Sequence, residues 1–233
     1  MLTTTNNGEV DFRQYSPLIS SQLSDQLTGV AEQLRGRRIV HVNSTAKGGG
    51  VAEILQSMTP LMNALGIETE WIVINPPAEF FQVTKKIHNL LQGADGTLST
   101  EELDVYYHSV QKVAEDMRRR ELSADVWFLH DPQLLPMARL LPRSSSDIWL
   151  WVCHIDLTNP NESVLNNLLP LVNDYDNLVF SLASYVPQGL TDMPPVFIAP
   201  PAIDPLTVKN VPLPRKRAEE LVAALGIDTS RPL

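Results

Sequence analysis

The chain has 233 residues, of which 43% are hydrophobic, and a formal net charge of −9 at pH 7. This composition is typical of a globular protein with room for one large or two small domains, and the acidic balance argues against general binding to nucleic acid or to an anionic membrane. The single cysteine, Cys153, excludes an internal disulfide and a multi-cysteine zinc site. No apolar run is long enough to span a membrane, and residues 1–11 lack the layout of a signal peptide, so we expect a cytoplasmic protein.

The first half of the chain predicts strands that alternate with helices. A β-branched run at residues 38–42 predicts a strand, and apolar residues at helical spacing predict a helix over residues 51–65, ended by Gly66. Pro60 lies inside that helix and is expected to kink or split it. The next strand is predicted at residues 71–74, followed by helices at 80–91 and 101–120, the second with Thr100 as its cap.

The second half of the chain predicts four short strands, at residues 126–129, 148–153, 178–180 and 196–198. Residues 148–153 are apolar on both alternating faces, which is typical of a central parallel strand covered by helices on both sides. The alternation as a whole predicts an α/β fold, a doubly wound and mainly parallel sheet. A proline-rich run at residues 205–214 predicts an extended linker, and residues 215–225 predict a final helix.

A glycine-rich segment provides the first candidate site. Ligands of open α/β sheets bind beyond the carboxyl ends of the strands, and Asn43, Lys47, Gly48, Gly49 and Gly50 follow the first predicted strand. Consecutive glycines between a strand and a helix permit close backbone approach and aim amide groups at an anion. The segment fits neither the Walker A nor the G-x-G-x-x-G pattern. A contact to phosphate or sugar and a tight turn that needs positive φ therefore both remain open.

A second candidate follows the strand at 126–129, where Asp131 and Gln133 flank a proline. A carboxylate accepts hydrogen bonds from sugar hydroxyls, and an amide both donates and accepts. The alternative interpretation is an Asp-Pro turn that begins the next helix.

The third candidate, His154 and Asp156, follows the most apolar strand of the chain. The two side chains share one face at strand spacing, so both are able to address one cleft, with Asp156 orienting the imidazole or binding separately. The alternative is a partly buried histidine that bonds a backbone carbonyl. Cys153 points to the opposite side, which argues against a Cys/His nucleophile. The remaining histidines lack metal-ligand spacing, so no metal site is expected.

Five segments of the chain, in this order, resemble the trehalose glycosyltransferring synthases of glycosyltransferase family 4. The first runs from His41 through the glycine loop to Leu55, and the resemblance extends from about residue 38 to the end of the chain. The segments are HVNSTAKGGGVAEIL at residues 41–55, EFFQVTKKIHNLLQG at 79–93, HDPQ at 130–133, CHID at 153–156 and PPAIDPL at 200–206.

The resemblance implies one half of a GT-B fold. It divides the chain into a partly helical N-terminal extension at 1–37, a Rossmann-like acceptor-side domain at 38–204, and a linker and helix at 205–233 that lead to a donor-binding domain outside this chain. Such an enzyme transfers glucose from a nucleoside diphosphate to free glucose with retention, which yields α,α-trehalose. A retaining trehalose phosphorylase and a non-catalytic sugar-binding domain are the alternatives.

The resemblance also assigns roles to the candidate residues. His154 and Asp156 would be catalytic, Asp131, Gln133 and Asn43 would bind the acceptor sugar, and the glycine loop with Lys47 would face the donor phosphate or sugar. The nucleotide-sugar is a substrate, so no cofactor or metal is expected. Neither nucleic acid nor membrane is expected as a partner, and a homodimer remains open.

Overall fold

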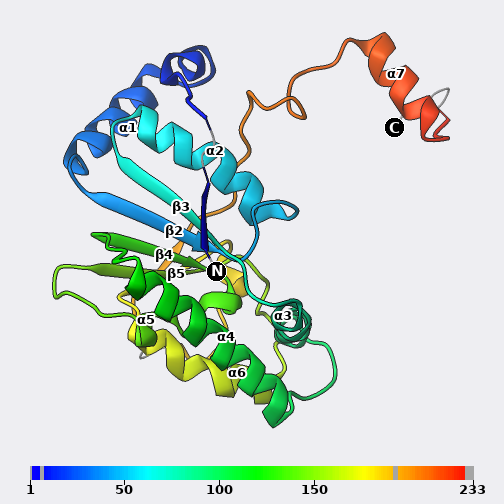
Figure 1. The fold of residues 1–233 in the computed structure, drawn as a ribbon. Helices are drawn as coiled ribbons and strands as arrows, with labels where there is room; N and C mark the ends of the chain where they lie inside the picture. Colours follow the sequence, from blue (N-terminus) through cyan, green and yellow to red (C-terminus); the bar gives the residue numbers. More distant parts are fainter. Residues whose placement is uncertain (1, 6–7, 191–193, 229–233) are drawn as a thin grey trace. The chain divides into compact units, whose positions relative to one another are not determined.

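The architecture is built on one mainly parallel β-sheet (Figure 1). The structure, a computed structural model, describes residues 2–5, 8–190 and 194–228. Among them, seven strands are arranged in the order β1-β3-β2-β4-β5-β6-β7, and β1 alone runs antiparallel to its neighbour. The strands are β1 (Leu2–Thr5), β2 (Arg38–Asn43), β3 (Glu68–Ile74), β4 (Val126–His130), β5 (Ile148–Cys153), β6 (Asn177–Phe180) and β7 (Val196–Ile198).

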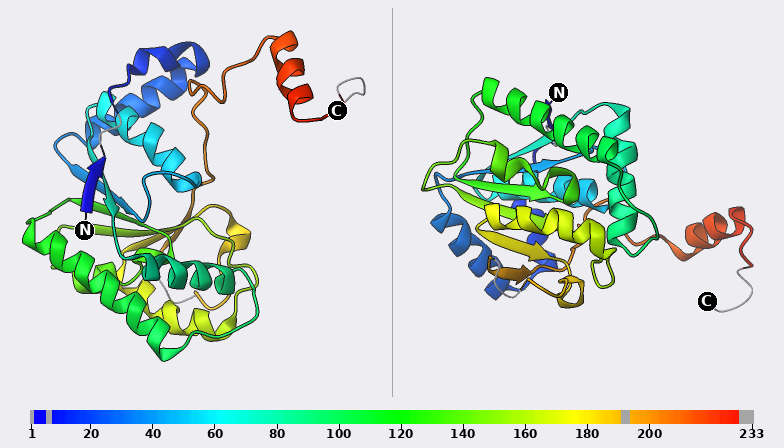
Figure 2. Two further views of the ribbon diagram at one scale, coloured as in Figure 1. Left: turned by 45° about the vertical axis from the view of Figure 1, so that its right-hand side comes forward. Right: turned by 90° about the horizontal axis from the view of Figure 1, so that it is seen from below.

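Helices cover both faces of the sheet, which confirms the doubly wound α/β prediction. In Figures 1 and 2, α1 and α2 lie on one face and α3, α4, α5 and α6 lie on the other. The helices are α1 (Ser21–Gln33), α2 (Gly50–Ala64), α3 (Ala78–Leu91), α4 (Thr100–Arg119), α5 (Met137–Leu140), α6 (Glu162–Leu168) and α7 (Arg215–Ala224). Short 3₁₀ helices occur at η1 (Phe12–Leu18), η2 (Pro132–Leu134), η3 (Leu169–Asp174) and η4 (Ala183–Tyr185).

The chain divides into two compact units, Met1–Pro201 and Ala202–Leu233. The first unit contains the whole sheet. In the second, the predicted helix is present as α7. Of the predicted extended linker, residues 205–211 form turns and bends instead, where the carbonyl of Asp204 accepts hydrogen bonds from the side chains of Thr207 and Asn210, and residues 212–214 have no regular secondary structure.

The structure corrects three local predictions. Ser99, not Thr100, caps α4, because its hydroxyl accepts a hydrogen bond from the backbone N–H of Glu102 while the Glu102 carboxylate accepts one from Ser99. Of the two effects predicted for Pro60, the split does not occur, because α2 continues from Gly50 to Ala64. The first residues of the N-terminal extension, for which no strand was predicted, form β1 and pair with Trp71–Ile74 of β3.

The larger hydrophobic core lies between the sheet and helices α3, α4 and α6. The Trp127 and Trp149 rings stack there with centroids 5.1 Å apart. A smaller cluster on the opposite face packs Leu55 of α2 against Trp71 of β3. Trp149, Trp151 and Cys153 of β5 belong to the larger core, whereas Ile148 is 44% exposed and Leu150 is partly exposed, so the prediction that β5 is covered on both faces holds fully for one face only.

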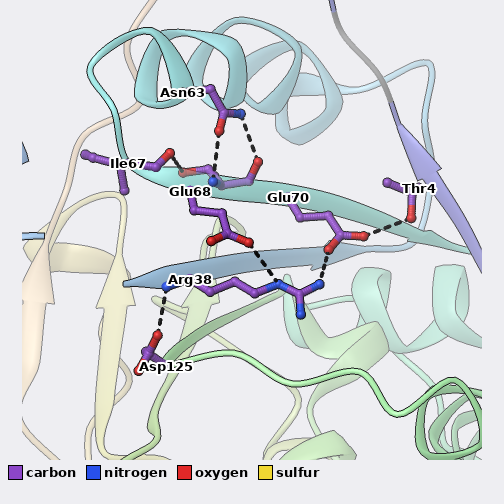
Figure 3. Close-up of polar contacts among 8 residues, drawn as sticks. Thr4, Arg38, Asn63, Ile67, Glu68, Glu70 and Asp125 are labelled. Carbon is purple, nitrogen blue, oxygen red and sulfur yellow. Dashed lines mark hydrogen bonds and ion pairs between the residues drawn. The ribbon is translucent and has the colours of Figure 1, made fainter. Parts of the chain in front are cut away.

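Polar contacts join the strands at the amino-terminal edge of the sheet (Figure 3). Arg38 of β2 donates to Glu70 of β3 over 2.6 Å, and Glu70 in turn accepts from the Thr4 hydroxyl of β1. The backbone N–H of Arg38 donates to the Asp125 carboxylate, directly before β4, over 2.8 Å. Side chains therefore link four neighbouring strands at the edge opposite the one where ligands of such sheets bind.

The β3 edge beyond β1 is completed by a side chain instead of a strand. The Asn63 amide accepts a hydrogen bond from the Thr69 backbone N–H over 3.0 Å and donates to the Thr69 carbonyl over 2.8 Å (Figure 3). β1 reaches only to Trp71, so without Asn63 both backbone groups would lack these partners.

We predict that Asn63→Ala lowers the free energy of unfolding by about 1–3 kcal/mol, because it leaves partly buried backbone groups unsatisfied. Urea denaturation of the variant beside the wild type measures the change. Gln111→Ala removes an amide of similar size from the exposed surface of α4 and serves as the control, with an expected change below about 0.5 kcal/mol. Equal effects of the two substitutions would contradict the role of Asn63.

Candidate functional site

The order of strands reverses between β2 and β4. After β2 the chain crosses to β3 on one side, and it then returns past β2 to β4 and continues outward through β5, β6 and β7. Ligands of open α/β sheets bind at such a switch point, outside the carboxyl ends of the strands. Because Val42 pairs with Leu129, the next residues, Asn43 and His130, end β2 and β4 at the same level. The segments that follow these strands therefore form the candidate site.

The glycine loop between β2 and α2 is open to solvent. Gly48 and Gly49 have φ of +74° and +109°, a conformation that side chains rarely adopt, and Gly49 is the N-cap of α2. A Cβ added at Gly48, Gly49 or Gly50 would have no atom within 4 Å beyond its chain neighbours and, for a helical glycine, the nearby helix backbone. The turn therefore needs glycine for its backbone, and the space over the loop is free for a ligand. Lys47 is exposed beside it.

Asp131, directly after β4, has a strained backbone. Its φ of +63° and ψ of +171° are unusual for a residue other than glycine, and such strain often occurs at functional sites. The conformation is held by three hydrogen bonds: the Asp131 N–H donates to the Val152 carbonyl, the Trp151 indole donates to the Asp131 carbonyl, and the Asp131 carboxylate accepts from the His154 backbone N–H over 2.9 Å. The turn after β4 and the residue after β5 are thus locked together.

Two buried tyrosines hold the rest of this turn. The Tyr106 hydroxyl of α4 donates to the Pro132 carbonyl over 2.5 Å, and the Tyr175 hydroxyl donates to the Leu135 carbonyl over 2.9 Å. The side-chain oxygen of Gln133 is buried and has no hydrogen-bond partner among the described residues. A buried acceptor without a partner is costly, so a ligand hydroxyl or N–H at this position would satisfy it.

Three histidines form a hydrogen-bonded chain through the switch point. His41 Nδ1 lies 3.1 Å from His130 Nε2, and His130 Nδ1 lies 3.0 Å from His154 Nε2. The rings of His130 and His154 stack with centroids 5.3 Å apart, as do those of His41 and His130. His41 and His130 are buried, whereas His154 is partly exposed at the carboxyl edge. Of the three histidines, His154 is therefore the one that a ligand can contact.

Burial keeps these rings neutral at pH 7. It lowers the pKa of His41 to about 3 and the pKa of His130 well below its ordinary range. A positive charge on His41 or His154 would lower the pKa of His130 further. Burial also lowers the pKa of His154, against the opposing effect of the Asp131 carboxylate. The pKa of Asp131 is raised by its own burial, although the charge and backbone N–H of His154 act in the other direction.

The structure brings some of the predicted site residues together and engages others elsewhere. Asp156 Oδ1 accepts from the backbone N–H of Thr158 over 2.8 Å, and among the described residues it has no hydrogen bond to His154, whose ring is oriented by His130 instead. Asn43 is buried, and its Oδ1 accepts from the Trp71 indole over 2.9 Å.

Sequence reasoning assigned no role to His41, His130 or Tyr106, although His41 and His130 begin two of the segments that carry the resemblance. The alternation of side chains along the strands could have indicated the two histidines. His41 and His130 lie on the same face of the adjacent strands β2 and β4, and His154 follows the next strand, β5. Among the described residues, no group of three or more His, Cys, Asp or Glu side chains is placed to hold a metal ion. None of the described helices is long and apolar enough to cross a membrane.

Comparison with known proteins identifies the family. A family model described as trehalose synthase, N-terminal domain, matches residues 41–187. A trehalose synthase from Rubrobacter xylanophilus is 39% identical over 237 residues, an alignment that covers all of this chain and 56% of the relative. This chain belongs to the trehalose synthase family. A second trehalose synthase, from Pyrococcus horikoshii, is 39% identical over 98% of the chain and 54% of its own length. The chain thus spans about half the length of these relatives.

A more distant relative of this chain is a trehalose phosphorylase from Pleurotus sajor-caju, which is 27% identical over 64% of this chain and 21% of its own length. Among solved structures, trehalose-6-phosphate synthase OtsA matches with a TM-score of 0.56 at 19% identity, covering 81% of this chain and 55% of that one. A second, described as from E. coli and bound with UDP-2-fluoro glucose, has a TM-score of 0.57 at 18% identity and covers 81% of this chain and 54% of that one. At these identities the matches show the fold, which is the Rossmann-like fold of GT-B glycosyltransferases.

We predict that Tyr106→Phe lowers the free energy of unfolding by about 1–3 kcal/mol, because the buried Pro132 carbonyl loses its donor. Tyr107→Phe removes the same hydroxyl from the next residue, which is 37% exposed, and is the matched control with an expected change below about 0.5 kcal/mol. Chemical denaturation at pH 7.5 measures both. If the two variants were equally stable, the Tyr106 hydroxyl would not hold the turn.

The histidine chain also predicts how stability depends on pH. The folded-state pKa of His41 is lowered, so below pH 6.5 the unfolded chain binds a proton at this residue that the folded chain does not, and stability falls as the pH falls. His41→Phe removes this loss and should reduce the drop in unfolding free energy between pH 7.5 and pH 5 by about 2 kcal/mol. Urea denaturation at the two pH values measures it. His108→Phe, on the exposed surface of α4, should leave the wild-type drop unchanged, and the same result for His41→Phe would refute the prediction.

Proposed function

We propose that this chain is the acceptor-side half of a retaining glycosyltransferase that transfers glucose from a nucleoside-diphosphate-glucose to free glucose, forming α,α-trehalose. The observation that carries the proposal is the meeting of three features at the switch point of the sheet: the open glycine loop, the strained Asp131 turn and the exposed end of the histidine chain. Membership of the trehalose synthase family supports the choice of reaction.

The glycine loop suits the donor side of this reaction. As the bond between the transferred sugar and the diphosphate breaks, negative charge develops on the leaving oxygen, and preorganised donors stabilise such charge. The loop places backbone amides at the amino-terminal end of α2, where the helix dipole favours an anion, and exposed Lys47 adds a positive charge nearby. These groups would serve the donor phosphate without a metal ion.

The Asp131 turn and His154 suit the acceptor side. Asp131 has a second carboxylate oxygen beyond the one bound to the His154 backbone, and Gln133 has its unpartnered side-chain oxygen, so both accept hydrogen bonds from sugar hydroxyls. His154 would contact the reacting sugar. Asp156 would act through the loop after β5, since its carboxylate holds Thr158, and Asn43 would line the floor of the site beneath the glycine loop.

A retaining trehalose phosphorylase is the second candidate, because phosphorylases appear among the more distant relatives at 27% identity. Such an enzyme acts on the same glycosidic bond with inorganic phosphate in place of the nucleotide. A sugar-binding domain without catalytic activity is the third.

Glucosyl transfer by the chain joined to the remaining half of the relatives' length tests the proposal. We expect trehalose from glucose and at least one of several nucleoside-diphosphate-glucose donors with the complete protein, and none with residues 1–233 alone. Phosphorolysis of trehalose without nucleotide-dependent synthesis would favour the phosphorylase. Binding of glucose with neither activity would favour the sugar-binding domain.

We predict that His154→Ala in the complete protein reduces kcat by a factor of about 10²–10³, because a well-placed polar contact to the reacting sugar is lost. The thermal midpoint should fall only modestly, because His154 is partly exposed and its loss leaves one buried ring nitrogen of His130 without a partner, at a cost of about 1–3 kcal/mol. Paired measurements of kcat and Tm separate this outcome from a purely structural role, and His108→Ala is the control. Normal kcat with a lowered Tm would return His154 to a structural role.

A further inference from the structure

The histidine chain has only two internally consistent directions. A neutral imidazole carries one N–H and one lone pair, and in this chain His41 Nδ1 meets His130 Nε2 while His130 Nδ1 meets His154 Nε2. If His41 donates, then His130 also donates and the remaining hydrogen of His154 is on Nδ1. If the direction is reversed, His154 Nδ1 is left with a lone pair. The direction therefore decides whether His154 offers a donor or an acceptor at the carboxyl edge.

The buried end of the chain distinguishes the two directions. His41 Nε2 is buried and has no hydrogen-bond partner among the described residues, and the His41 ring is stacked on Phe128 with centroids 4.5 Å apart. In the outward direction this nitrogen is a lone pair, whereas in the inward direction it is an N–H. Buried N–H groups without an acceptor are rarer in proteins than acceptors that lack a donor. The buried end therefore favours the outward direction.

The outward direction also fixes which nitrogen of His154 carries hydrogen at the exposed end of the histidine chain. His154 cannot donate through Nε2 in the outward direction, because that nitrogen accepts from His130. The hydrogen is then on Nδ1, the nitrogen that the chain leaves free for a ligand.

We propose that His41 and His130 are positioning residues that fix the direction of this hydrogen-bond chain, so that His154 presents its Nδ1–H as a hydrogen-bond donor to an oxygen of the bound sugar. The inference rests on the proposed function for the identity of the ligand alone. It makes His154 a donor that holds a sugar oxygen, and it excludes His154 as the base that removes a proton from the acceptor hydroxyl, because the ring has no lone pair on the ligand side.

Nitrogen-15 NMR of the imidazoles tests the direction on the 233-residue chain itself. Long-range proton–nitrogen spectra at pH 7.5 show which ring nitrogen carries hydrogen in each histidine. We expect hydrogen on Nδ1 in His41, His130 and His154, and exposed His108 is the internal reference. Hydrogen on Nε2 of His154 in the wild type would overturn the proposal without the need for any variant.

A variant tests whether His41 sets the direction. His41→Phe keeps an aromatic ring against Phe128 but removes the donor, so His130 is free to reverse and a population of His154 with hydrogen on Nε2 should appear. His108→Phe makes the same change outside the chain and should leave the His154 spectrum unchanged. Retention of the pure Nδ1–H form in folded His41→Phe would show that His41 does not set the direction.

Addition of D-glucose separates this inference from the proposed function. The direction of the chain is measured before any sugar is added, so it stands or fails independently of activity. A shift of the His154 Nδ1 resonance on titration, with the His108 resonance unmoved, supports a sugar at this end of the chain. Absence of any response at saturating glucose, with the outward direction observed, would count against the acceptor site and leave the direction established.

Discussion

The parallel pairing of β2 with β4 is the constraint on which the site depends. It places the last residues of two strands that are distant in sequence at one level, so that the segments following them share one end of the sheet. β5 extends the same register by one strand and brings His154 beside the turn after β4. This register places the glycine loop and the Asp131 turn at the same end of the sheet. It also brings the three histidines, which are distant from one another in the sequence, into contact.

The site stores unfavourable local structure that the surrounding core compensates. Asp131 has a strained backbone, and His41 and His130 are polar rings withdrawn from water. Each is held by bonds from rigid neighbours: the Trp151 indole and the Val152 carbonyl fix Asp131, and His41 and His130 bond one another, although His41 Nε2 has no partner among the described residues. Such arrangements persist where the rest of the fold over-determines them, and they pre-organise polar groups before a ligand arrives.

Most of the sheet could be predicted from the sequence, because apolar runs such as residues 148–153 specify strands by composition alone. β1 could not, since three threonines after Leu2 become a strand only because the edge of β3 offers a partner. The candidate segments were likewise readable as polar residues after strands. Their mutual geometry was not, because contact between His41 and His130 depends on the register of two strands 89 residues apart in the chain.

The Asn63 side chain has a further consequence for the behaviour of the protein in concentrated solution. Exposed strand edges present free N–H and C=O groups that another chain can pair with, which is a common route to aggregation. β1 covers β3 only from Trp71 to Ile74, and the Asn63 amide occupies both backbone groups of Thr69 beyond it. The Asn63 side chain therefore prevents a strand of another molecule from pairing with Thr69, in the part of β3 that β1 does not cover.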